Sequence, residues 1–250
     1  MTTATANQMA RAARAATRDQ AARFCETEYA RLAALLRALT PDEWRSPTDC
    51  APWDVRAMAG HLVGAAEEAS LPALVRHAIA GLRVHGMRRL SDLVNGVNEV
   101  QIREQASRTT EELVEALERA APAQVRNRRS PDWYTAFIPS PTPVNTVSLR
   151  TVQVLVLNRD LWMHRIDICR ATGRSMELTA DHDSVVVEDI VASWAGRHRQ
   201  QYSLVLDGPA GGAYAQGNGA AELRLDAVEF CRIVSGRAPG DGLLATPVLF

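Results

Sequence analysis

The feature that most constrains this chain is a series of long segments in which apolar residues return every three or four positions. The first segment covers about residues 17–39, and its apolar residues are Phe24, Tyr29, Leu32, Leu35, Leu36 and Leu39. This spacing places them on one face of a helix, which Pro41 then ends because proline cannot donate a backbone hydrogen bond. Amphipathic helices must bury their apolar faces against one another, so the pattern predicts a helical bundle.

Further helices follow the first one. Asp54 stands where an N-cap is expected, ahead of a helix over about 55–69. Another covers about 92–120, with a fresh start indicated at Thr109. The fourth long helix covers about 145–171 and ends at a glycine.

The segments between these helices are less regular. Residues 71–87 favour a helix broken by glycines, and the polar, proline-rich residues 122–143 favour a long loop. After about residue 175 a helix over 183–197 is followed by alternating strand patterns and a glycine-rich turn over 208–212. A last short helix is expected over 227–234.

The chain is therefore predicted to be mostly α, in three parts. Residues 1–17 are expected to be a flexible N-terminal lead, and residues 18–175 a four-helix bundle. Residues 176–250 are expected to form a small α+β domain.

Charge and composition exclude several classes of function. The 250 residues include 28 Lys and Arg and 29 Asp and Glu, so the net charge is only −1. Such a balance gives no attraction to nucleic acid or to an anionic membrane. The N-terminus has no apolar signal region, and no stretch approaches the roughly 18 apolar residues of a membrane span. We therefore expect a soluble, cytoplasmic protein that is a monomer or a homodimer.

The four cysteines are not expected to form a site of their own. Cys25, Cys50, Cys169 and Cys231 are far apart and form no CxxC pair. A disulfide framework is not expected in a chain of this size with so few cysteines. They are predicted to be reduced and mostly buried thiols.

Three residues form a candidate metal site. Asp160 and His164 are four apart on the fourth long helix, so their side chains project side by side. His61 lies among small and apolar residues of the helix over 55–69, which suggests that it faces the interior. Three such ligands would leave an open position, as in catalytic zinc sites. By spacing alone, a hydrogen-bonded core histidine and a surface ion pair are the more common interpretation of these residues.

The neighbouring residues carry a family resemblance. The stretch WRSPTDCAPWDVRAMAGHL at 44–62 and the stretch DLWMHRID at 160–167 resemble the mycothiol-dependent maleylpyruvate isomerases. These belong to a wider group of DinB-like four-helix bundles that bind metal. The segments 206–212 and 226–237 are similar to the sterol-carrier-like C-terminal domain of the same proteins.

The resemblance implies a set of ligands and a cofactor. A divalent metal, usually zinc in the family, would bind to His61, Asp160 and His164. The family usually has Glu where this chain has Asp160. Because Asp is one methylene shorter, the helix must lie closer to the metal, or the carboxylate reaches it through water.

The resemblance also implies an activity. The metal would hold mycothiol, a sugar thiol, as a thiolate near neutral pH. That thiolate would serve cis–trans isomerisation or S-transfer of a small electrophilic substrate. The alternative that stays open is a non-enzymatic protein that binds metal or an apolar ligand.

Several other residues have secondary roles in this interpretation. Arg237, and less so Arg232, matches the region in which the family offers an Arg to an anionic substrate. Asp167 orients a metal ligand or pairs with a neighbouring Arg, and Trp53 and Trp162 are expected to pack in the bundle. The remaining histidines are interpreted as solvent-facing or structural, namely His77, His85, His182 and His198.

Overall fold

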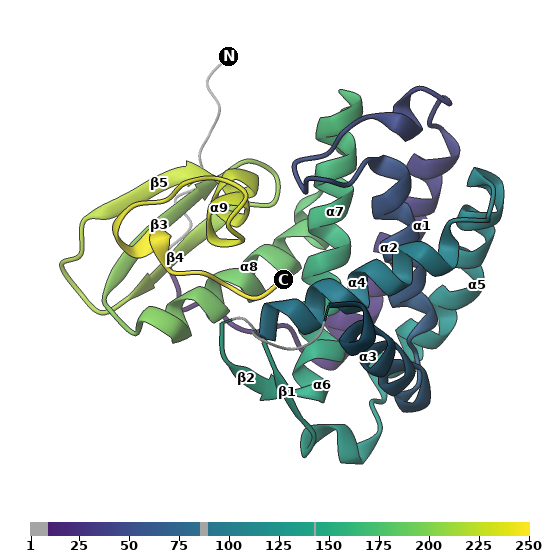
Figure 1. The fold of residues 1–250 in the computed structure, drawn as a ribbon. Coiled ribbons are helices and arrows are strands. Elements are labelled where there is room, and N and C mark those ends of the chain that lie inside the picture. Colours follow the sequence, from purple (N-terminus) through teal and green to yellow (C-terminus); the bar gives the residue numbers. More distant parts are fainter. Residues whose placement is uncertain (1–9, 86–89, 143) are drawn as a thin grey trace. The chain divides into compact units, whose positions relative to one another are not determined.

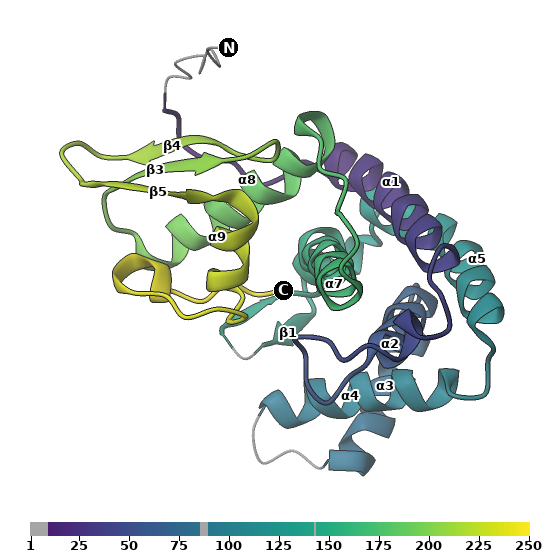
Figure 2. The same cartoon turned by 90° about the horizontal axis from the view of Figure 1, so that it is seen from above.

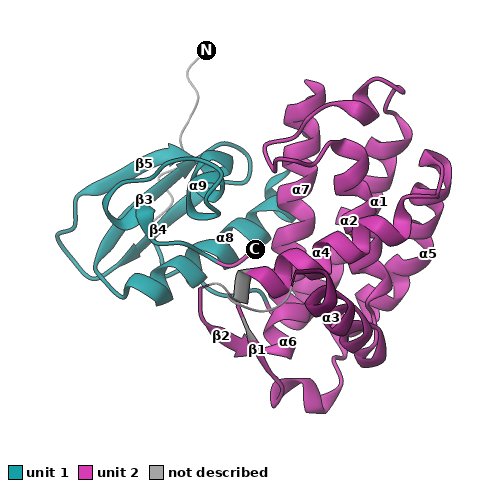
Figure 3. Cartoon of the chain, in the orientation of Figure 1, with its two compact units in different colours: residues 1–16, 177–248 teal, residues 17–176, 249–250 magenta. Residues whose placement is uncertain are grey.

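The structure is a computed structural model that describes residues 10–85, 90–142 and 144–250. It divides into two compact units, coloured separately in Figure 3. One unit holds residues 17–176 and 249–250, and the other holds the described part of 1–16 together with 177–248. No helix among the described residues is long and apolar enough to cross a membrane.

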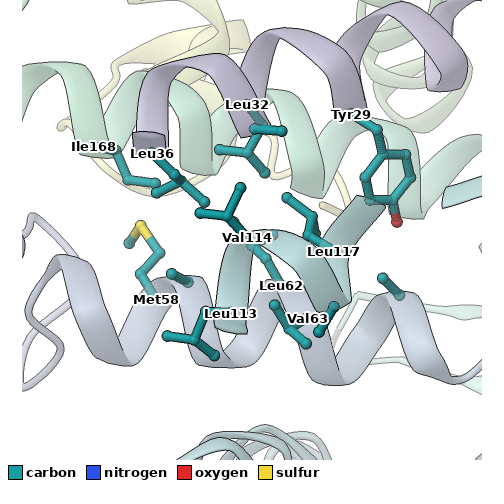
Figure 4. Close-up of a cluster of buried hydrophobic side chains, with 14 of the residues drawn as sticks. Tyr29, Leu32, Leu36, Met58, Leu62, Val63, Leu113, Val114, Leu117 and Ile168 are labelled. Atoms are coloured by element: carbon teal, nitrogen blue, oxygen red, sulfur yellow. The ribbon is translucent and has the colours of Figure 1, made fainter. Parts of the chain in front are cut away.

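The first unit is a helical bundle (Figure 1). Its core is enclosed by four helices, which are α1 (Arg18–Arg37), α2 (Val55–Glu67), α5 (Thr110–Arg129) and α7 (Leu157–Thr172). Figure 4 shows side chains of all four meeting in this core, among them Leu32, Leu36, Met58, Leu62, Leu113, Leu117 and Ile168. The mostly α fold predicted from the apolar spacing is confirmed.

The ends of these helices follow the signals in the sequence. Thr17 and Thr109 each form a capping box, with Gln20 and Glu112 respectively. The Asp54 carboxylate accepts a hydrogen bond from the Ala57 amide at 2.7 Å and so caps α2.

The fresh start indicated at Thr109 is confirmed: the segment 92–120 is divided between α4 (Leu90–Gln105) and α5, which begins at Thr110. One prediction about the middle of the bundle is wrong. The expected loop over 122–143 begins too early, since α5 continues through Pro122 to Arg129.

Tertiary hydrogen bonds explain why α5 continues beyond its proline. The Gln124 amide donates to the Ala66 carbonyl at 2.8 Å, and the Asn127 amide donates to the Ala69 carbonyl at 2.6 Å. These contacts with the end of α2 offset the backbone hydrogen bond that Pro122 cannot make.

The chain then enters α7 by an irregular path. A 3₁₀ turn (η2, Trp133–Ala136) leads to a short antiparallel pair of strands, β1 (Pro139–Pro141) and β2 (Thr146–Ser148). One helical turn (α6, Leu149–Thr151) follows, and then a π-helical turn, η3 (Val152–Val156). In this turn the Leu157 amide donates to the Val152 carbonyl five residues back, one more than in a regular helix.

Helices α3 (Leu71–His85) and α4 form a hairpin beside α2 (Figures 1 and 2). Glycines permit the close packing. A Cβ at Gly64 of α2 would lie 2.5 Å from the Cβ of Gln101 of α4. Glycine at position 64 therefore lets α4 approach α2 closely enough for Gln101 to reach the interior of the bundle.

The second unit is a small α+β structure, as predicted. Its sheet has the order β4-β3-β5, with β3 (Tyr202–Asp207) antiparallel to β4 (Gly212–Gln216) and parallel to β5 (Glu222–Asp226). Helices α8 (Ala180–His198) and α9 (Ala227–Val234) cover the sheet, and a 3₁₀ turn, η4, follows (Gly242–Ala245).

Aromatic rings join the layers of this unit. The ring of Trp194 from α8 lies 5.1 Å from that of Tyr202 on β3 and 5.5 Å from that of Phe230 on α9. Within the expected N-terminal lead, Arg11 pairs with Tyr214 of β4 as a parallel bridge. The sterol-carrier-like nature of this domain stays a prediction.

Candidate metal centre

His61 is placed by the turn that precedes α2 as well as by the helix itself. The Val55 amide donates to the Ser46 carbonyl at 3.0 Å, and Pro47 and Asp54 form an antiparallel bridge. Asp54 then caps α2, and His61 lies two turns further on with only 5% of its surface exposed. The interior position expected for His61 is what the structure shows.

Asp160 and His164 lie one turn apart on α7 and point at His61. The distance from His164 Nε2 to Asp160 Oδ1 is 3.2 Å, and that from His61 Nε2 to Asp160 Oδ2 is 3.4 Å. One ligand atom from each of the three residues lies within 4.8 Å of the other two. The structure thus brings together all three predicted ligands.

These distances fit a divalent metal such as zinc. Zinc binds His nitrogen and carboxylate oxygen at about 2.0–2.2 Å in a tetrahedral arrangement, which puts neighbouring ligand atoms roughly 3.3 Å apart. His164 Nε2 and His61 Nε2 lie 3.2 and 3.4 Å from the two different oxygens of Asp160, distances of the same order. The shorter side chain of Asp160 therefore leaves its carboxylate within the range of direct ligation, although metal binding itself stays a prediction.

Both histidines are held from behind by a hydrogen-bond acceptor. Asp167 Oδ2 lies 3.0 Å from His164 Nδ1, and Gln101 Oε1 lies 2.7 Å from His61 Nδ1. Each Nδ1 thus carries a hydrogen, and each Nε2 is the ring nitrogen that faces Asp160. This arrangement is typical of histidines that bind metal. Asp167 thus contacts His164, as the first of the two roles considered for it requires.

The charges at the site are strongly coupled. Burial alone would raise the pKa of the Asp160 carboxyl, but the charge of His164 and the hydrogen bonds from His164 and His61 hold that pKa well below its usual value. Burial also opposes a charge on His164, yet the Asp160 carboxylate raises the pKa of His164 well above its usual value. A metal that binds here must therefore displace a proton from His164.

Trp53 and Cys50 line the same region. The ring of Trp53 lies 5.1 Å from that of His61 and 6.1 Å from that of His164, so it packs against both histidines. The Cys50 thiol donates to Asp167 Oδ2 at 3.5 Å. Cys50, His164 and Asp167 also group their ligand atoms within 4.8 Å. That second group would need His164 Nδ1, which already donates to Asp167, so the first group is the better metal site.

The predicted arginine belongs to the other unit. Gly236, with φ of 81°, lets the chain turn back after α9. The amides of Gly236 and Arg237 then donate to the carbonyls of Ile233 and Arg232, which closes a Schellman motif. Arg237 is half-buried there, and the Arg232 guanidinium is 3.3 Å from Glu229 Oε2. A catalytic role for Arg237 stays a prediction.

Gln101 was not foreseen from the sequence. It lies 40 residues from His61 along the chain and carries no local motif. A polar residue between the apolar positions of a helix was the only available signal, and that signal is common on solvent-facing helices.

Comparison with known proteins identifies the family. A sequence model described as the mycothiol maleylpyruvate isomerase N-terminal domain matches residues 25–169, which include all three candidate ligands. The chain belongs to this family. The family and the enzyme class expected from the sequence are thereby confirmed, and no curated protein sequence matches the chain.

Solved structures of the mycothiol-dependent maleylpyruvate isomerase share the fold of this family member. Both that enzyme and a histidine-to-alanine mutant of it align with a TM-score of 0.54 and 14% sequence identity. Each alignment covers 88% of this chain and 90% of the other. At this identity the likeness concerns the fold alone.

Proposed function

We propose that this protein is a divalent-metal- and mycothiol-dependent enzyme that isomerises, or transfers the thiol to, a small electrophilic substrate. The observation that carries the proposal is the convergence of His61 Nε2, His164 Nε2 and the Asp160 carboxylate, each within 4.8 Å of the others. The family indicates which thiol would bind, because the description of the matching family names mycothiol.

The residues present would hold the metal with three side chains and leave a position open. Bound there, zinc would lower the pKa of an entering thiol so that it reacts as a thiolate near neutral pH. Asp167 and Gln101 keep the two histidines turned towards that position. Trp53 packs against the rings of both histidines and so forms part of the wall of the site.

The chemistry of isomerisation needs no outside oxidant or base. The thiolate sulfur forms a bond to one carbon of a cis double bond that is conjugated with a carbonyl. The π electron pair of the double bond then moves onto the carbonyl oxygen. Rotation about the new single bond and elimination of the thiolate then give the trans product. In S-transfer the carbon–sulfur bond persists instead, and the enolate takes a proton from water, or a leaving group departs from the carbon with its electron pair. Arg237 would bind an anionic group of the substrate.

We place the protein in the cytoplasm, as a monomer or a homodimer with a small-molecule substrate. The domain division at about residue 175, with a sterol-carrier-like second domain, belongs to the same proposal. A binding protein for an apolar ligand is the competing function.

The test is metal content followed by activity. We expect about one zinc per chain in the wild type, much less in His61→Ala, and an unchanged amount in His85→Ala, whose histidine pairs with Glu99 at the surface. Mycothiol should support turnover of maleylpyruvate or conjugation of an electrophile only in the metal-loaded protein. Little metal in the wild type, or full activity in His61→Ala, would refute the proposal. Stabilisation by apolar ligands alone would favour the binding protein.

A further inference from the structure

A row of buried polar side chains leads away from His61 through the bundle. It runs from Gln101 on α4 to Glu68 at the end of α2 and to His77 on α3. The exposed fractions of these three residues are 3%, 9% and 1%. Burying such groups is costly unless they are hydrogen-bonded to one another. Metal ligation by itself requires only His61, so the rest of the row needs a separate explanation.

The hydrogen bonds leave one orientation for the Gln101 amide. Its Nε2 donates to Glu68 Oε1 at 2.6 Å, and its Oε1 lies 2.7 Å from His61 Nδ1. A carboxylate can only accept hydrogen bonds, so the amide nitrogen must face Glu68. The reverse orientation would place two acceptors 2.6 Å apart. The amide oxygen therefore faces His61, and His61 must carry its hydrogen on Nδ1.

His77 holds the far end of the row. Its Nδ1 bonds to Glu68 Oε1, the same oxygen that accepts from Gln101. Its Nε2 lies 3.0 Å from Glu104 Oε2 and 2.7 Å from the guanidinium of Arg76, which in turn pairs with Glu104. The hydrogen bond to Glu68 raises the pKa of His77. Glu68 is thus held from two sides and cannot turn away from Gln101.

We propose that Gln101 and Glu68 form a positioning relay that keeps a hydrogen on His61 Nδ1 and turns Nε2 towards Asp160, and that His77 anchors this relay from α3. The consequence for metal binding rests on the proposed function. The hydrogen bond from His61 Nδ1 to Gln101 is a property of the metal-free protein. His164 obtains the same support directly from Asp167 on its own helix, whereas His61 depends on two other segments of the chain.

Metal affinity separates this relay from general packing. Gln101→Met removes the acceptor for His61 and should weaken zinc binding by about 10- to 100-fold, measured by competition with a chromophoric chelator. Gln105→Met is the matched control. Gln105 is also 3% exposed and lies one turn further along α4, but its amide donates to Glu67 at 3.0 Å. We expect its zinc affinity to stay within about twofold of the wild type. Equal losses in the two variants would overturn the proposal.

The tautomer is tested without metal. Long-range proton–nitrogen NMR spectra of the metal-free wild type should show His61 with Nδ1 protonated, with His61→Gln used for assignment. Glu68→Gln, whose amide can accept or donate, should leave Nδ1 of His61 only partly protonated.

A wild-type spectrum in which Nδ1 of His61 carries no hydrogen would refute the relay, even if Gln101→Met fails to fold. A wild type that binds no metal but carries a hydrogen on His61 Nδ1 would refute the proposed function and leave the relay intact.

Discussion

Gly64 lies where α2 and α4 come closest, and the structure leaves no room there for a methyl group. A Cβ at this position falls 2.5 Å from the Cβ and 2.9 Å from the Cα of Gln101. Carbon atoms pack at about 3.5–4.0 Å, so Gly64→Ala must displace this part of α4 by roughly 1 Å. The hydrogen bond from His61 Nδ1 to Gln101 Oε1 measures 2.7 Å, and such a displacement stretches it to about the 3.5 Å at which a hydrogen bond is lost.

Two opposing effects set the expected magnitude. Overpacking costs about 1–3 kcal/mol, and alanine gains up to about 1 kcal/mol over glycine in helix propensity. We therefore expect Gly64→Ala to lower the free energy of unfolding by roughly 1–2 kcal/mol and zinc affinity by at least about tenfold.

Gly60→Ala supplies the control for this prediction. It lies one turn earlier on α2, and the nearest atom to its Cβ is 3.4 Å away, an ordinary contact distance. This variant should be neutral or more stable than the wild type. Urea unfolding of the metal-free proteins and chelator competition measure both effects. If Gly64→Ala stabilises the protein as much as Gly60→Ala does, the packing argument is wrong.

Three more predictions concern charge. Because Asp160 raises the pKa of His164 from 6.5, that residue's contribution to the stability of the metal-free protein is present below about pH 6.5 and lost as pH rises through its folded pKa. Zinc affinity should rise over the same pH range. Thermal unfolding with and without zinc measures both effects. An unfolding midpoint of the metal-free protein that increases with pH over this range would contradict the first expectation. Glu28→Gln leaves the buried guanidinium of Arg165 without its carboxylate. It should lower the free energy of unfolding, measured in urea, by about 3–5 kcal/mol. Glu118→Gln, in an exposed pair with Arg37, should cost at most about 1 kcal/mol, and similar losses in both would argue against a burial effect. Arg237→Ala should lower mycothiol-dependent turnover by about 10- to 100-fold, the equivalent of one charged hydrogen bond. Its zinc content should not change, and turnover equal to the wild type would remove Arg237 from the mechanism.

The half of the site on α7 was predictable from the sequence because it is local. Asp160, His164 and Asp167 lie within eight residues, and helix geometry alone places their side chains on neighbouring positions of one face. The glycine that ends the helix is equally local: Gly173 has φ of 70°, and the Arg174 amide donates to the Cys169 carbonyl.

The half of the site on α2 was only partly predictable. His61 could be selected through its flanking residues, but Gln101 and Glu68 could not, because their positions depend on how α3 and α4 pack against α2. The same limit explains Pro122, whose helix continues because of contacts that residues beyond it make with α2. Contacts between distant segments leave no periodic trace in the sequence.

The π-helical turn at Val152–Val156 has a consequence for how this site can change in evolution. It holds one residue more than a regular turn, directly before the helix that carries Asp160 and His164. Each residue turns a helix by about 100°. A deletion inside this turn would therefore rotate both side chains away from His61, or force the preceding segment to rotate instead. Related chains that differ in length at these five residues should therefore differ in metal binding, even where all three ligands are retained.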